Sequence, residues 1–258
     1  IETDDGMRVS LGPSVIPDDL RADIRDRKIK RVLAIGQGTA AVAGQALAAG
    51  LDAITPNGEI EVEAVLATEL SGFRLRPDMS DTLVIAISQS GTTTDTNRTV
   101  DIVRNRGAKV IAIVNRRGSD LTDRADGVLY TSDGRDVEMS VASTKAFYSQ
   151  IAAGLLLSVA LTDELLGDEM IADRAALLAG ISELPAAMET VLSRRDVIGE
   201  AARQFCPSRR YWAMVGNGPN RIAAQEVRVK LSELCYKSIA ADSTEDKKHI
   251  DLSSEPLI

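Results

Sequence analysis

This chain of 258 residues is poor in aromatic residues, cysteine, histidine and basic charge. Aromatic residues make up 3% of the sequence while hydrophobic residues make up 44%, so the core must be built from Ala, Val, Leu and Ile. That composition is typical of helices packed tightly on a parallel sheet. The two cysteines, Cys206 and Cys235, provide no disulfide framework and no metal-ligand spacing. We expect both to be buried as small hydrophobic side chains.

The charge balance and the apolar runs exclude further classes of protein. A net charge of −8 and a pI near 4.9 leave no basic surplus to displace counterions, which argues against a nucleic-acid partner. The longest apolar run, residues 151–161, is shorter than the roughly 20 residues that span a bilayer, and no signal peptide is evident. We therefore expect a soluble, cytoplasmic protein with no membrane partner, no metal and no cofactor. Because the chain begins at Ile1 rather than Met, we also expect it to be part of a longer protein.

Two similar turns indicate an internal repeat. "VLAIGQG" (32–38) matches "WAMVGNG" (212–218), and Gln45 and Gln225 hold equivalent places in the helix-like runs that follow. Repetition at this spacing predicts a duplicated α/β domain. We assign residues 1–190 to the first copy, with an N-terminal helix, and residues 191–258 to a second copy that is too short to be complete.

Strand-like and helix-like runs alternate through the first copy. Strands are predicted at 31–36, 61–65, 82–88, 109–115 and 127–131, and helices at 17–28, 40–50, 93–106 and 140–164. A short helix follows the second strand, and further helices over 168–205 are expected to break at Pro185. This alternation predicts a three-layer αβα fold with a parallel sheet of the flavodoxin or Rossmann type.

Polar residues follow the first and third strands, where ligands of open α/β sheets bind. The first strand leads into Gln37–Ala40 and the third into "SQSGTTTDT" (88–96), where a helix begins. Ser88, Ser90 and Thr93 can donate to a phosphate, aided by the positive end of that helix. Helix capping by one Ser or Thr is the alternative, but capping does not require several such residues around a glycine.

The first turn also fits a dinucleotide fingerprint, with Gly36, Gly38 and Ala41 as G-x-G-x-x-A. That interpretation requires an acidic residue at the end of the second strand to hold a ribose, a role open only to Glu61 or Glu63. A dinucleotide would leave the Ser-rich loop without a function. A compact sugar phosphate uses both features, so we favour it.

Charged residues form a stripe on the helix after the second Gly-x-Gly turn. Glu226, Lys230, Glu233 and Lys237 recur at helical spacing, as expected for either a solvent-exposed face with ion pairs or a set of reactive groups. His249 is the only histidine and the only side chain that titrates near neutrality without perturbation.

Together these motifs resemble the isomerase part of the glutamine–fructose-6-phosphate aminotransferase (glucosamine-6-phosphate synthase) family, which is built from two sugar isomerase (SIS) domains. The family's V-A-S-T-K-A-F is reproduced by Val141–Phe147, and its S-Q-S-G-E-T is matched by Ser88–Thr93. Its C-G-T-S turn corresponds to Gln37–Ala40. Its K-L-K-E followed by K-H is partly matched by Lys230–Glu233 and Lys248–His249. The resemblance covers nearly the whole chain.

The resemblance implies a role for each matching residue in converting fructose 6-phosphate to glucosamine 6-phosphate. Glu233 would move a proton between C1 and C2, Lys230 would assist proton transfer at a hydroxyl, and His249 would open the sugar ring. The residues that would bind the phosphate are Ser88, Gln89, Ser90 and Thr93, and those that would contact the sugar are Thr39, Val141 and Ser143. In the family the histidine comes from the neighbouring subunit, which implies a homodimer, and a glutaminase domain precedes the isomerase part.

The sequence departs from the family pattern at Gln37, Ala40, Thr92 and Ile250, and the family's tail lysine would lie beyond Ile258. The changed first turn favours an alternative, a double-SIS deglycase or amino-sugar-phosphate isomerase without a glutaminase partner. A non-catalytic sugar-phosphate sensor is a third interpretation, although a sensor would not need Lys230, Glu233 and His249.

Overall fold

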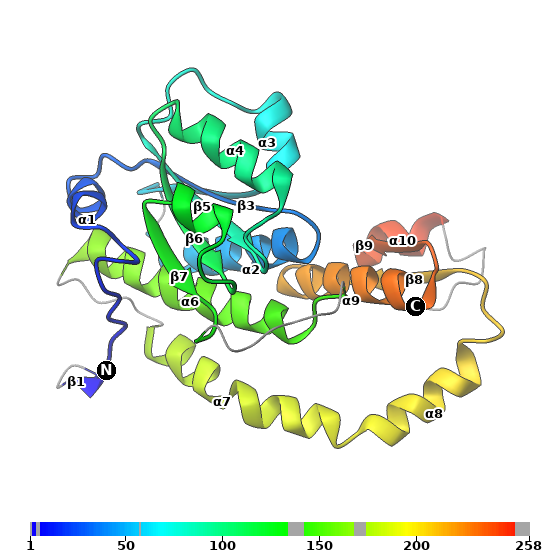
Figure 1. The fold of residues 1–258 in the computed structure, drawn as a ribbon. Coiled ribbons are helices and arrows are strands. Elements are labelled where there is room, and N and C mark those ends of the chain that lie inside the picture. The colour runs from blue at the N-terminus through cyan, green and yellow to red at the C-terminus, as the bar shows by residue number, and fades with distance from the viewer. Residues whose placement is uncertain (1, 4–5, 57, 134–141, 168–173, 251–258) are drawn as a thin grey trace. The chain divides into compact units, whose positions relative to one another are not determined.

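The computed structural model describes residues 2–3, 6–56, 58–133, 142–167 and 174–250. The chain divides into two compact units, Ile1–Ala175 and Ala176–Ile258, each of which is described by itself (Figure 1). The sequence-based boundary between the repeat copies, at residues 190 and 191, stays a prediction, because compactness alone does not define the copies.

The first unit is built on a five-stranded parallel sheet with the strand order β4-β3-β5-β6-β7. Its strands are β3 (Arg31–Gly36), β4 (Glu61–Leu66), β5 (Thr82–Ser88), β6 (Lys109–Val114) and β7 (Gly127–Tyr130). In chain order this is the 2-1-3-4-5 arrangement of flavodoxin-like folds, whose order reverses between β3 and β5. A two-stranded hairpin, β1 (Glu2–Thr3) and β2 (Gly6–Met7), precedes it. The predicted parallel α/β sheet is confirmed.

Helices cover both faces of this sheet (Figure 1). They are α1 (Asp18–Arg25), α2 (Thr39–Ile54), α3 (Ala67–Phe73), α4 (Thr94–Arg104), α5 (Asp120–Arg124) and α6 (Lys145–Leu166). Helices α3 and α4 lie on one face, and α2 and α6 pack against each other on the other. Every residue of β5 is buried, as its apolar sequence predicts for a strand covered on both sides.

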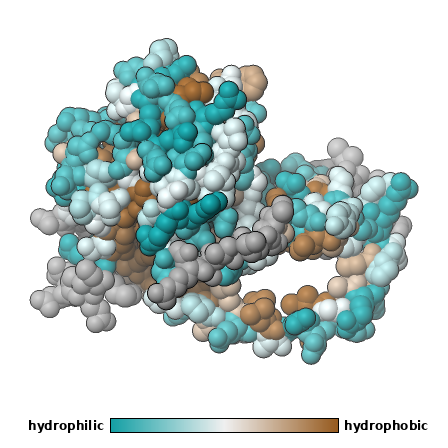
Figure 2. Space-filling model, viewed as in Figure 1, coloured by the Kyte–Doolittle hydropathy of each residue, from teal (hydrophilic) through white to brown (hydrophobic). Residues whose placement is uncertain are grey.

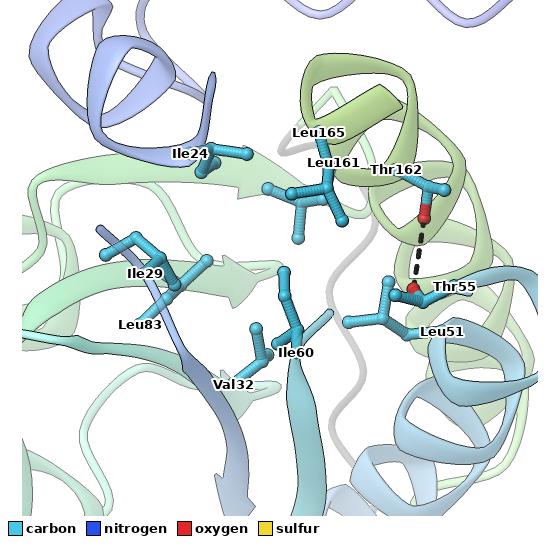
Figure 3. Close-up of a pocket in the computed structure, with 10 residues that line it drawn as sticks. All are labelled: Ile24, Ile29, Val32, Leu51, Thr55, Ile60, Leu83, Leu161, Thr162 and Leu165. Atoms are coloured by element: carbon cyan, nitrogen blue, oxygen red, sulfur yellow. Dashed lines mark hydrogen bonds between the residues drawn. The ribbon is translucent and has the colours of Figure 1, made fainter. Parts of the chain in front are cut away.

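A small apolar pocket lies at the amino ends of the strands (Figure 3). Its lining comes from α1, α2, α6 and the residues around the strand starts: Ile24, Ile29, Val32, Leu51, Thr55, Ile60, Leu83, Leu161, Thr162 and Leu165. The hydroxyls of Thr55 and Thr162 are 3.5 Å apart and share a hydrogen bond. This pocket is at the edge opposite the polar loops and offers an anion no charged partner.

An ion pair between Asp19 of α1 and Lys109 of β6 makes stability pH-dependent. The hydrogen bond from Lys109 lowers the pKa of Asp19, and the same bond raises the pKa of Lys109. Since the folded pKa of Asp19 lies below its unfolded value near 3.8, its contribution is complete above that pH and is lost as the pH falls through the folded pKa. Because Asp19 is 63% exposed, the contribution is at most about 1 kcal/mol.

Asp19→Asn removes this pH-dependent contribution. When the pH is lowered below about 4, the melting temperature of the variant should therefore fall less than that of the wild type. Parallel pH curves for variant and wild type would contradict this.

The second unit repeats the start of the first on a smaller scale. Its elements are most of α7 (Arg174–Leu192), then α8 (Arg195–Phe205), β8 (Trp212–Val215), α9 (Pro219–Cys235), β9 (Ile239–Asp242) and α10 (Thr244–Ile250). Strands β8 and β9 pair in parallel across α9, as β3 and β4 do across α2.

The two Gly-x-Gly turns have the same backbone geometry. A Cβ on Gly36 would meet the backbone of Ala40 at 2.8 Å, and one on Gly216 would meet that of Asn220 at 2.4 Å. Gly38 and Gly218 precede their helices with φ/ψ of 56°/−130° and 54°/−134°. Only glycine permits both the close approach and the positive φ. The predicted repeat is therefore present in the backbone.

Two expectations for the second unit were wrong. Helix α7 continues through Pro185 and ends near Ser193, because the helix is largely exposed and water can satisfy the carbonyl that proline leaves without a donor. Cys206 is only half-buried and Cys235 is exposed. Both lie at helix ends, Cys206 after α8 and Cys235 as the last residue of α9. Among the described residues, the sheet of this unit has two strands, which provide little interior.

Helices α6 and α7 are longer than the apolar run seen in the sequence. By length and composition alone, these two helices of the described residues could cross a membrane. The apolar window of α6 is 56% buried, as in the core helix of a globular domain, whereas that of α7 is 6% buried. Exposed apolar side chains of α7 and α8 are Val191, Leu192, Val197, Ile198 and Phe205. Figure 2 shows apolar surface along this part of the chain. One or two such helices are weak evidence for a membrane protein.

Candidate functional site

The polar loops predicted to form the site lie at one edge of the sheet. Strands β3 and β5 are neighbours and run in parallel, with Ile35 opposite Ala86. The turn at 37–39 and the loop at 88–93 therefore leave the sheet side by side at the carboxyl ends of these strands. This is the point where the strand order reverses, the usual ligand position in such sheets.

The loop between β5 and α4 ends at an uncapped helix N-terminus. Thr93 is the N-cap residue of α4, but its side chain makes no capping hydrogen bond. Instead, its hydroxyl is 3.4 Å from that of Ser88. The first N–H groups of an α-helix have no partner within the helix, so an uncapped start attracts an anion. Thr93 therefore does not act as a side-chain cap of α4.

Hydrogen bonds within the loop engage several of the predicted phosphate donors. Ser88 is buried, and its hydroxyl accepts the N–H of Gly91 at 3.0 Å. The hydroxyl of Ser90 accepts the N–H of Thr92 at 3.2 Å and lies 2.9 Å from the Thr92 hydroxyl. Ser90, Gln89 and Thr93 are half-buried and can reach a ligand. Their roles toward phosphate stay predictions.

Residues outside the motif hold the loop in place, and sequence analysis did not identify them. The carbonyl of Gln89 accepts the backbone N–H groups of Asn115 and Arg116 at 3.2 and 3.3 Å, which joins the loop to the end of β6. On the other side, Asn97 and Ser119 are buried against Gly91. These contacts join separate segments of the chain, and no local pattern signals them.

The first turn, at residues 37–39, resembles a dinucleotide-binding turn but makes different contacts. The side-chain amide of Gln37 donates to the hydroxyl of Thr68 at 3.1 Å. Thr39, a predicted sugar contact, is the half-buried first residue of α2. Of the other two predicted sugar contacts, Ser143 is half-buried just before α6, and Val141 lies outside the described residues.

The acidic residues that a dinucleotide would need are not at the carboxyl end of β4. Glu61 is the first residue of β4 and pairs with Arg31, with 3.0 Å between Glu61 Oε2 and Arg31 Nε. Glu63 forms a two-pronged pair with Arg74 at 2.5 and 2.8 Å. Neither lies at the carboxyl end of its strand, where a ribose would bind. The structure thus favours the sugar-phosphate interpretation over the dinucleotide one.

The charged stripe on α9 contains a compact cluster. Lys230 Nζ lies 2.7 Å from Glu233 Oε2 and 3.7 Å from Glu226 Oε1. The Glu226 and Lys230 side chains are largely buried, while that of Glu233 is 39% exposed. Lys237 turns away from this cluster to the carbonyl of Arg209 and to the ring of Trp212, 4.5 Å from its centroid. An accessible carboxylate beside a lysine can take up and return a proton.

The predicted site residues fall in both units. The phosphate-loop residues and Thr39 belong to the first unit, whereas Lys230 and Glu233 belong to the second, and each group is described within its own unit. His249 lies in α10, and its side chain is outside what the structure describes. Over the described ranges, no group of three or more His, Cys, Asp or Glu side chains could hold a metal ion.

The strand order, the loop at the reversal point and the repeated turn define a doubly wound α/β domain with a ligand position at the carboxyl ends of β3 and β5. Residues 27–160 match the family model of the SIS domain, and the chain belongs to that family.

Curated relatives narrow the resemblance to one branch of the family. The chain is 35% identical over 235 residues to glutamine–fructose-6-phosphate aminotransferase (isomerizing) of Corynebacterium efficiens, covering 90% of this chain and 36% of the relative. The Streptomyces coelicolor enzyme of the same name is 36% identical over 228 residues, covering 86% and 35%. The chain thus spans about a third of the length of these relatives. The resemblance to the isomerase part of this family is confirmed.

A solved structure agrees with the fold. The C-terminal domain of glucosamine-fructose-6-phosphate aminotransferase from Francisella tularensis superimposes with a TM-score of 0.78 at 24% identity. The match covers 95% of this chain and 67% of that domain.

Proposed function

We propose that this chain is the isomerase part of a glucosamine-6-phosphate synthase, which converts fructose 6-phosphate to glucosamine 6-phosphate. The observation that carries the proposal is the uncapped start of α4 behind the Ser/Thr loop, at the point where the strand order reverses. The names of the curated relatives point to the same reaction. Ammonia would come from a glutaminase domain elsewhere in the full protein, in a cytoplasmic setting.

In this proposal the first unit binds the substrate. Ser88, Gln89, Ser90 and Thr93 hold the phosphate with the N–H groups of α4, and Thr39, Val141 and Ser143 contact the sugar. Neutral donors suit a phosphate because the dipole of α4 supplies the compensating positive potential. Binding through the phosphate fixes C1 and C2 at a constant distance from the loop.

The second unit supplies the proton chemistry. Glu233 takes the proton from C1 of the ketose imine and returns it to C2, so the double bond moves and an aldose with an amino group at C2 forms. Lys230, 2.7 Å from Glu233, assists transfer of the hydroxyl proton at C1. His249 of a neighbouring subunit opens the sugar ring, which requires a homodimer.

A glutaminase-independent deglycase or amino-sugar-phosphate isomerase is the second candidate. The hydrogen bond between Gln37 and Thr68 favours this candidate. Through this bond the side chain of Gln37, which departs from the family pattern, holds the turn rather than contacting a sugar. A non-catalytic sensor is less favoured, since the phosphate loop alone would serve it and the Lys230–Glu233 pair would have no function.

Ligand-dependent melting tests the binding site directly. Fructose 6-phosphate at about 100 times its dissociation constant should stabilise the protein by about 2.7 kcal/mol, which raises the melting temperature by a few degrees. Glucosamine 6-phosphate should act similarly, whereas unphosphorylated fructose and NAD should not. A shift with NAD, or an equal shift with fructose, would contradict the proposal.

A further inference from the structure

Gly91 occupies the centre of the phosphate loop in a conformation that few other residues adopt. Its φ is +66°, and a Cβ at this position would lie 2.0 Å from the Ser119 hydroxyl oxygen and 2.6 Å from the Ser119 Cβ. The N–H of Gly91 donates to the hydroxyl of Ser88. The loop is thus packed tightly at this point rather than free to adjust.

Two buried donors hold the carbonyl oxygen of Gly91. The side-chain Nδ2 of Asn97 donates to it at 3.2 Å, and the backbone N–H of Leu121 donates to it at 3.0 Å. Asn97 is 6% exposed and Leu121 is fully buried. The carbonyl therefore points into the protein, between α4 and α5.

This direction matters for an anion because a carbonyl oxygen carries partial negative charge. Turned instead toward the open N–H groups at the start of α4, this oxygen would repel a phosphate bound there. In the free protein the oxygen is already held inward. The loop therefore does not have to rearrange when the ligand binds, which saves the free energy of that rearrangement.

Asn97 performs this task at a cost to stability. Its Oδ1 is buried without a hydrogen-bond partner among the described residues. A buried acceptor of this kind is destabilising, and an apolar side chain of similar shape would avoid the penalty. An asparagine that served packing alone would gain nothing from this arrangement.

We propose that Asn97 is a positioning residue that fixes the Gly91 carbonyl inward and so preforms the loop for the dianionic phosphate of a sugar phosphate. The proposal rests on the phosphate-binding role proposed above for this loop. Asn97 touches the loop and not the substrate, and it acts through the orientation of one peptide group.

The test is Asn97→Leu in the full protein, with Thr96→Val as the matched control. Leucine removes both the donor to Gly91 and the unpartnered acceptor, so the melting temperature should stay the same or rise while the dissociation constant for fructose 6-phosphate increases about tenfold. Thr96 is the preceding residue, is also fully buried, and its hydroxyl has no hydrogen-bond partner among the described residues. Thr96→Val should therefore leave the affinity unchanged.

Hydrogen exchange separates this inference from the proposed function. In ligand-free protein, Asn97→Leu should speed exchange of the Gly91 and Thr92 amides, whereas Thr96→Val should not. If wild type fails to bind fructose 6-phosphate but exchange still accelerates, the proposed function fails and the positioning role stands. Unchanged exchange in Asn97→Leu, or a lower melting temperature with unchanged affinity, would overturn the positioning role.

Discussion

Glu233→Gln is expected to lower the rate of isomerisation about 10²–10⁴-fold while leaving fructose 6-phosphate affinity nearly unchanged. The amide keeps the shape of the carboxylate but cannot take a proton from C1. Because the Glu233 side chain is 39% exposed and Lys230 keeps Glu226 as an ion-pair partner at 3.7 Å, the change in stability should stay below about 1 kcal/mol. Turnover of the full-length protein, together with solvent deuterium incorporation at the transferred position, measures the effect.

Glu200→Gln provides a matched control for this substitution. Glu200 lies in α8 and pairs with Arg203 three residues later at 3.0 Å, as Glu233 pairs with Lys230 three residues earlier. Its substitution removes an ion pair of the same spacing, on a more exposed surface and outside the proposed chemistry, so turnover should be unchanged. Full turnover in Glu233→Gln, or an equal loss in both variants, would refute the assignment of Glu233 as the base.

Gly91→Ala should abolish measurable ligand binding and destabilise the first unit by about 2–5 kcal/mol. The range adds the cost of a positive φ for a residue with a Cβ to the cost of overpacking. The new Cβ would lie 2.0 Å from the Ser119 hydroxyl oxygen, so either the loop or the start of α5 must move. Chemical denaturation measures the stability, and calorimetry with fructose 6-phosphate measures the binding.

Gly118→Ala is a control that separates the cost of a positive φ from the cost of the contact with Ser119. Gly118 has a similar φ of +59°, but nothing lies within 4 Å of a Cβ placed there. This variant should lose only the conformational part, about 1–2 kcal/mol, and should bind ligand normally. If both variants lose the same stability and both keep binding, the packing of Gly91 against Ser119 does not shape the site.

Local patterns in the sequence were enough to predict the parallel sheet and the position of the polar loops. The apolar run at 82–88 became the buried β5, and the hydroxyl residues behind it lie where parallel strands end. Contacts made by residues outside the loop motif could not be read in the same way. Asn97 looks like an ordinary polar residue on a helix, and only the folded chain places it on the carbonyl of Gly91.

The wrong expectations for the second unit have a common physical cause. Burial of Cys206 and Cys235 was inferred from residue type, but burial depends on how many elements pack around a residue. Within the part of the chain that the structure describes, β8 pairs only with β9. Pro185 was expected to break a helix, but an exposed helix tolerates the missing bond because water replaces it. The type of a residue alone does not predict whether that residue is buried or exposed to water.

The shared geometry of the two Gly-x-Gly turns allows the two helices behind them to be compared position by position. Counted from Gly36 and Gly216, Lys230 of α9 corresponds to Gly50 of α2, and Glu233 corresponds to Ala53. In the first copy the space at Gly50 is already taken, since a Cβ there would come within 2.5 Å of Leu155 of α6. A side chain at that position would require Leu155 to move. The two copies therefore use this position differently: Gly50 of the first copy packs against Leu155 of α6, whereas Lys230 of the second copy carries a charge paired with Glu226 and Glu233.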